Sequence, residues 1–131
     1  MTRLGLALLA LGASVPAVAV GLGPLSRSGV SDGPAKAFYL TVMNPYREAV
    51  GFRAYAVGFD DEGPQSRVQV YPARIRLAGE GQRKILVVAR DLAPGETYAF
   101  RVCAEREKQV EGMIHARVCS KLSARRLRFA A

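Results

Sequence analysis

The sequence holds few side chains in arrangements that could do chemistry, and the acidic run Asp60-Asp61-Glu62 is the first of them. Neighbouring carboxylates can transfer protons or bind a calcium ion. These three precede Gly63-Pro64, and the sequence has neither a second acidic cluster nor the spacing of a calcium-binding loop. We therefore expect a solvated turn at this position.

The other candidates for chemistry are His115, Cys103 and Cys119. Nucleophilic catalysis needs a base beside the nucleophile and a third group that orients the base. His115 stands in a segment of alternating apolar residues, and no such motif surrounds it. Two cysteines and one histidine are too few for a zinc site. The sequence thus predicts a protein that is not an enzyme and needs no metal or cofactor.

The two cysteines are better explained as a pair. If the last hairpin is centred on Glu111, Cys103 and Cys119 lie directly opposite each other on antiparallel strands. Opposed residues are about 4.5–5.5 Å apart at Cα, which is within the range of a disulfide. Closing a loop of about 15 residues would stabilise the fold by about 3 kcal/mol.

The N-terminus has the features of a secretory signal peptide. Arg3 supplies a positive start, residues 4–13 are apolar, and Ala17-Val18-Ala19 matches a small-x-small cleavage site. We expect residues 1–19 to be removed and the mature chain, 20–131, to be periplasmic, where disulfides persist. No other segment has the roughly 18 consecutive apolar residues of a membrane-spanning helix, so no span is expected in the mature chain.

Composition and charge narrow the possible partners. The chain has 131 residues, half of them hydrophobic, which allows one domain with a core. Its formal net charge is +8. A basic protein can bind nucleic acid, an anionic surface or an acidic partner. Export argues against nucleic acid, and both a simple solvated surface and an acidic partner stay open. The sequence does not indicate an oligomeric state.

Apolar and polar residues alternate in short segments, as they do in strands. Turn residues separate these segments at roughly ten-residue intervals. The segments are residues 38–42, 50–59, 68–70, 74–77, 85–89, 98–102 and 114–122. This pattern predicts an all-β, immunoglobulin-like Greek-key sandwich of about seven strands in a single domain.

Three further segments lead to local expectations. The stretch 20–36 is rich in Gly, Ser and Pro, so it should form an irregular edge strand or a partly mobile arm. Pro72 favours an edge or a switch between sheets, and the basic tail 124–131 should be frayed. The Pro94-Gly95 turn before Tyr98 predicts a tyrosine corner, with the ring inward and the hydroxyl bonded to the preceding backbone.

Several of these segments, taken in order, resemble the N-terminal domain of periplasmic pilus-assembly chaperones, the PapD-like family. Residues 38–45 (FYLTVMNP) look like the second strand of that domain with its exit asparagine. Residues 70–77 (VYPARIRL), the turn 79–82 and the apolar strand from Ile85 are similar to a later passage of the family. The resemblance covers residues 25–122.

The resemblance implies a function and a partner. These chaperones cap unfolded pilin subunits by adding a strand to them, so that main-chain hydrogen bonds give affinity and alternate side chains give specificity. Ile114, Ala116 and Val118 would then be the apolar residues of the donated strand. Arg27 and Lys121 would bind the terminal carboxylate of the subunit.

A competing resemblance leaves a second function open. Residues 92–102 (LAPGETYAFRV) look like the corner between two strands of fibronectin type III domains, although this chain lacks the tryptophan usual in their core. Under that reading the chain is a general extracytoplasmic adhesion or adaptor module. Both readings predict the same sandwich, and a fold does not decide a function.

Overall fold

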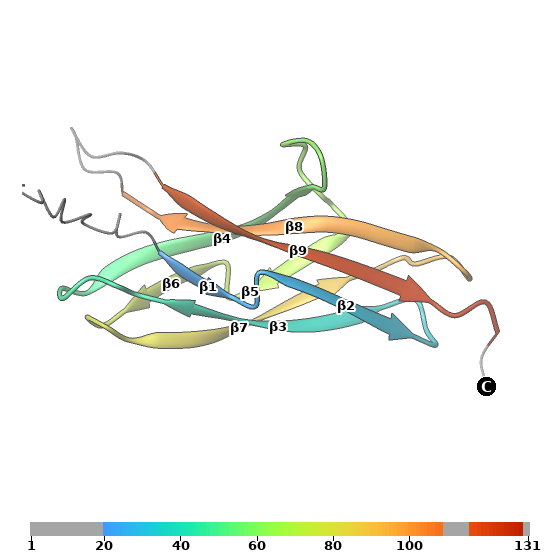
Figure 1. Ribbon diagram of the computed structural model, residues 1–131, viewed down its shortest axis with the longest axis horizontal. Helices are drawn as coiled ribbons and strands as arrows, with labels where there is room; N and C mark the ends of the chain where they lie inside the picture. Colours follow the sequence, from blue (N-terminus) through green and yellow to red (C-terminus); the bar gives the residue numbers. More distant parts are fainter. Residues whose placement is uncertain (1–19, 109–115, 130–131) are drawn as a thin grey trace, which may run out of the picture.

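The computed structural model describes residues 20–108 and 116–129, which form two β-sheets packed face to face (Figure 1). No helix occurs among these residues. The nine strands are β1 (Gly21–Gly23), β2 (Ser26–Ser31), β3 (Lys36–Met43), β4 (Val50–Gly58), β5 (Val68–Tyr71), β6 (Arg74–Leu77), β7 (Gln82–Ala89), β8 (Thr97–Arg106) and β9 (Arg117–Arg126).

The strand order confirms the immunoglobulin-like sandwich and adds two strands to it. One sheet has the order β1-β3-β7-β5 and the other β2-β9-β8-β4-β6. The additional strands, β1 and β2, come from the Gly- and Ser-rich segment and lie at one edge of each sheet. Strand β2 runs parallel to β9, whereas the other pairings are antiparallel.

The core lies between the sheets and follows the alternation of the sequence. In β3, Phe38, Leu40 and Val42 are buried, while Tyr39 between them is exposed. The largest apolar side chains that are fully buried are Phe52, Phe100, Leu40, Ile85, Leu92, Leu122, Val42, Val87 and Val102. Burying each such side chain contributes about 1.5–3 kcal/mol, so this cluster is the main source of stability.

The structure confirms the expectation for Pro72 and corrects the one for the C-terminal tail. Pro72 stands between β5 and β6, which belong to different sheets, so the strand switch is confirmed. The frayed tail is wrong for residues 124–126, because β9 continues to Arg126. Ala124 fills a buried position opposite Tyr98, and Arg126 donates a hydrogen bond to the carbonyl oxygen of Leu92 at 2.8 Å.

Tyr98 is only partly the expected tyrosine corner. Its ring packs inward beside Phe100, with ring centroids 5.1 Å apart. Its hydroxyl, however, donates to Oε1 of Gln65 at 2.5 Å, so the expected bond to the preceding backbone is wrong. Within the turn before Tyr98, the carboxylate of Glu96 accepts a hydrogen bond from the amide of Ala93 at 2.9 Å. Tyr98 therefore bonds to a different loop.

Asn44 fixes the exit from β3. Its side chain is buried, and its amide nitrogen donates to the carbonyl oxygens of Glu48, Leu77 and Ala78 at 2.9, 3.2 and 3.0 Å. Its side-chain oxygen accepts from the amide of Tyr46 at 2.9 Å. One polar side chain thus satisfies backbone groups of two connections, because buried carbonyl oxygens need partners.

Candidate partner-binding edge

Strand β9 is covered along only part of its outer edge. Strand β8 pairs with it on one side from Arg117 to Arg125. On the other side β2 pairs with it from Lys121 to Arg126, beginning at Ser26. Among the described residues, no strand pairs with the outer edge of Arg117–Cys119. The expected exposed edge strand is thus confined to the start of β9, and its second half is protected by β2.

The apolar residues expected on this strand differ in position. Ala116 is exposed and lies just before β9. Val118 is half-buried and packs against the core cluster. Ile114 lies outside the described residues, as does His115. The free edge ends at Ser120, whose hydroxyl donates to the carbonyl oxygen of Pro24 at 2.6 Å.

The structure brings Arg27 and Lys121 onto neighbouring strands. Arg27 pairs with Leu122, and Lys121 pairs with Ser26. Both line a shallow pocket of about 220 Å³, whose other lining residues are Ser26, Ser28, Phe59, Leu122 and Ser123. The ammonium group of Lys121 lies 5.6 Å from the centroid of the Phe59 ring, within the range of a cation–π contact. Two cationic side chains, three serines and an aromatic ring thus line one pocket beside the free edge.

The disulfide between Cys103 and Cys119 is confirmed. The two residues are directly opposed in the β8–β9 register, with their Cα atoms 4.0 Å apart. Because their neighbours Val102 and Ala104 face the core, the disulfide lies on the outer face of the five-stranded sheet. It ties β9 to β8 at the C-terminal limit of the free edge.

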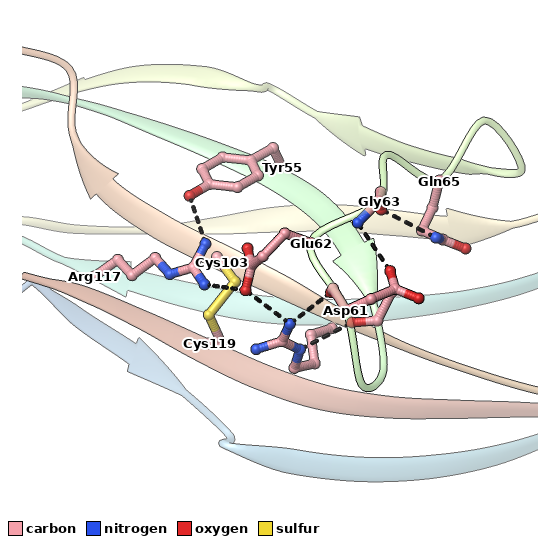
Figure 2. A network of polar contacts seen from close by, with 10 residues as sticks. Tyr55, Asp61, Glu62, Gly63, Gln65, Cys103, Arg117 and Cys119 are labelled. Carbon is pink, nitrogen blue, oxygen red and sulfur yellow. Dashed lines mark hydrogen bonds and ion pairs between the residues drawn. A yellow bond between two sulfur atoms is a disulfide. The ribbon is translucent and has the colours of Figure 1, made fainter.

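A network of charged side chains covers this disulfide (Figure 2). Oε1 of Glu62 accepts hydrogen bonds from Arg117 at 2.5 Å and from Arg101 at 3.1 Å. Arg117 also donates to the hydroxyl of Tyr55 at 3.2 Å. The hydrogen bond from Arg117, and then that from Arg101, lower the pKa of Glu62 from 4.5 to about 2. Glu62 is therefore ionised at any physiological pH.

Residues 60–62 are exposed, as expected of a solvated turn, but Glu62 also forms ion pairs that the sequence did not predict. The carboxylate is still largely exposed, but it joins residues of β8 and β9. Sequence alone could not reveal this contact, because it depends on the register that places Arg101 and Arg117 near the same loop. Among the described residues, no group of three or more His, Cys, Asp or Glu side chains could hold a metal ion.

Comparison with solved structures identifies the architecture. No family model and no curated protein matches the chain. The Escherichia coli chaperone DraB is 17% identical, with a TM-score of 0.67 over 86% of this chain and 57% of its own. A Salmonella enterica structure of the SafB chaperone with the SafA pilin gives 20% identity and a TM-score of 0.64 over 82% of this chain. The fold is that of a PapD-like domain.

A third PapD-like match is a single domain. PapD-like domain 7 of human CEP192 is 17% identical, with a TM-score of 0.66 over 99% of this chain and 100% of its own. By contrast, this chain spans only 57% and 54% of the matched chains in the two chaperone structures. Since all these identities are low, the likeness establishes the fold, and the function has to be argued from the edge of β9. No helix among the described residues is long and apolar enough to cross a membrane.

Proposed function

We propose that this PapD-like domain is a periplasmic chaperone-like or assembly-accessory protein that binds an exported, pilin-like subunit by pairing of edge strands. The observation that supports this most directly is the free edge at Arg117–Cys119, next to the pocket that contains Arg27 and Lys121. An unpaired edge offers main-chain donors and acceptors to another chain, and proteins normally protect such edges. Here β2 protects only the second half of the strand.

In the proposed complex, a strand of the subunit pairs with the start of β9 and its side chains meet Ile114, Ala116 and Val118. Main-chain hydrogen bonds would supply the affinity and these alternate residues the specificity. Strand β2 occupies the same edge from Lys121 onward, so the subunit strand has to end near Pro24. A terminal carboxylate at that point would lie close to Lys121 and Arg27, whose charges it would complement.

The matched chaperones support a subunit as the partner. The similar structures include complexes of the SafB chaperone with the SafA pilin and of CsuC with the tip subunit CsuE. Export of this chain to the periplasm, expected from its first 19 residues, would place it in the compartment of such subunits. Because strand pairing involves no reaction, the proposal assigns no catalytic residue.

The test is co-purification with a pilin-like subunit encoded by a neighbouring gene. Ala116→Asp, and the double variant Ile114→Asp with Val118→Asp, should abolish capture, because an unpaired charge cannot enter an apolar groove. Val30→Asp is a matched control, since Val30 is exposed on β2 away from the free edge. Circular dichroism verifies folding. Normal capture by folded Ala116→Asp protein and by the double variant would refute strand pairing.

A second measurement addresses the pocket. Lys121→Ala should weaken capture more at low ionic strength than at high ionic strength, because an exposed contact with a carboxylate is screened by salt. A subunit whose terminal carboxylate is amidated should be insensitive to the same change. An equal effect of Lys121→Ala on both forms of the subunit would argue against carboxylate binding.

The alternative is a general extracytoplasmic adaptor module, and one observation favours it. The PapD-like domain 7 of CEP192 matches 99% of this chain. A PapD-like domain can therefore be part of a protein that is not described as a pilus chaperone. An adaptor would not depend on the edge of β9. Capture of a partner that survives the Asp variants would support this second reading.

A further inference from the structure

The loop between β4 and β5 folds back over the outer face of the five-stranded sheet. Nε of Arg101 donates to the carbonyl oxygen of Gly58 at 2.9 Å, and the same guanidinium group donates to the carbonyl oxygen of Asp61 at 2.8 Å. Within the loop, the amide of Gly63 donates to Oδ1 of Asp61 at 2.8 Å. Arg101, on β8, thus binds the backbone of the loop on both sides of Asp60 and fixes the segment that carries Glu62.

The absence of a side chain at Gly58 leaves room for the carboxylate of Asp61. A Cβ atom at position 58 would lie 2.1 Å from Oδ1 of Asp61, which is far inside van der Waals contact. The amide of Gly58 also donates to the carbonyl oxygen of Gly63 at 3.0 Å, closing the loop at its base. The position of Glu62 over β8 and β9 is therefore set by backbone contacts as well as by its own ion pairs.

We propose that Glu62 is a positioning residue for the partner-binding edge. Its carboxylate holds Arg117, the first residue of β9, against the outer face of the sheet at 2.5 Å. Arg117 immediately precedes Val118 and follows Ala116, two of the residues that would contact the subunit. Glu62 touches neither of them, so its effect on binding passes through Arg117. This inference rests on the proposed function.

The physical reason lies in how β9 is fixed along its length. From Lys121 onward the strand has partners on both sides, and at Cys119 the disulfide ties it to β8. Arg117 lies beyond both of these restraints, on the side of the final hairpin, and pairs with β8 alone. Strand ends with one partner open locally more easily than strands inside a sheet. The pair of Glu62 with Arg117 extends the ordered edge by two residues beyond the disulfide.

An ordered edge favours association, because less conformational freedom is lost when the partner strand binds. Removing the pair should therefore leave the fold intact but raise the dissociation rate of the complex. For one exposed ion pair we expect a loss of affinity of about threefold to fivefold. Arg117→Gln should have a similar effect. The variant that combines Glu62→Gln with Arg117→Gln should lose little more affinity than either single variant, since the two residues act through one contact.

The experiment compares Glu62→Gln with Asp60→Asn in the full-length protein. Both variants remove one carboxylate from the same turn, but Asp60 has no polar partner among the described residues. Amide hydrogen exchange of the free protein reports the order of residues 117–119, and dissociation of the co-purified pilin-like subunit reports the effect on binding. We expect faster exchange and faster dissociation for Glu62→Gln only, with both variants still folded by circular dichroism.

Three outcomes are distinguishable. Faster exchange together with weaker capture supports the positioning role. If Glu62→Gln matches Asp60→Asn in both measurements while Ala116→Asp abolishes capture, the positioning role is wrong and the proposed function stands. If Ala116→Asp and the double Asp variant keep capture, the proposed function fails, and the positioning role fails with it.

Discussion

Removing the disulfide should destabilise the protein without changing its fold. We choose Cys103→Ala with Cys119→Ala, because Cys103 is buried and a serine there would place a hydroxyl group out of contact with water. The cysteines are separated by 16 residues in sequence. The entropy that this loop regains in the unfolded chain corresponds to about 3 kcal/mol of unfolding free energy. For a domain of about 110 residues, the melting temperature should fall by about 12 °C.

The assay is thermal unfolding followed by circular dichroism, with three samples at equal concentration: oxidised wild type, reduced wild type and the double Ala variant. The reduced protein and the variant should melt together, since both lack the cross-link and keep a small apolar group at each site. Thiol counting on denatured, unreduced wild type should find no free thiol. Two free thiols, or a variant that melts within 3 °C of the oxidised protein, would refute the reasoning, given the shift of about 12 °C expected from loop entropy.

Three further predictions follow from other parts of the molecule. Mass spectrometry of protein from the periplasm should find a mature chain that begins near Val20, and soluble cytoplasmic material with intact Met1 would contradict export. Asn44→Ala should lower the unfolding free energy by about 2 kcal/mol in urea titrations, because buried carbonyl oxygens lose their donor; an unchanged midpoint would show that water replaces the side chain. Glu62 and Glu96 both have a pKa lowered to about 2, mainly by hydrogen bonds from Arg117 and Arg67. Their stabilising effect is complete above pH 4.5 and is lost as the pH falls toward 2, so urea midpoints should show a smaller acid-induced decrease in the variant with Gln at both positions.

Much of the fold could be predicted because it depends on local patterns. The alternation around Phe38, Leu40 and Val42 indicates a strand with one buried face, and β3 has this arrangement. The pairing of Cys103 with Cys119 needed only the centre of one hairpin, since register within a hairpin is a local property. Pro72 predicted an edge or a switch between sheets because proline cannot donate to a ladder, and the switch is what the structure has.

The parts that could not be predicted depend on contacts between distant segments. The protection of β9 by β2 joins the two ends of the described chain, and the sequence 26–31 (SRSGVS) has no apolar alternation that would indicate a strand. The role of Glu62 required the registers of β4, β8 and β9 together. The hydroxyl of Tyr98 donates to Gln65 rather than to the preceding backbone because the loop between β4 and β5 passes near it. Each of these depends on tertiary arrangement.

The pairing of β2 with β9 also affects when this protein can fold. Figure 1 shows β2, the second strand of the described chain, beside β9, its last strand, and their register runs from Ser26 with Lys121 to Ser31 with Arg126. The five-stranded sheet therefore cannot be completed until residue 126 has emerged from the ribosome or from a translocation channel. Contacts so distant in sequence also form slowly, because closing a long loop costs entropy before any contact compensates for it. If the chain is exported as proposed, this late completion of the sheet would favour an incompletely folded chain during passage through the membrane.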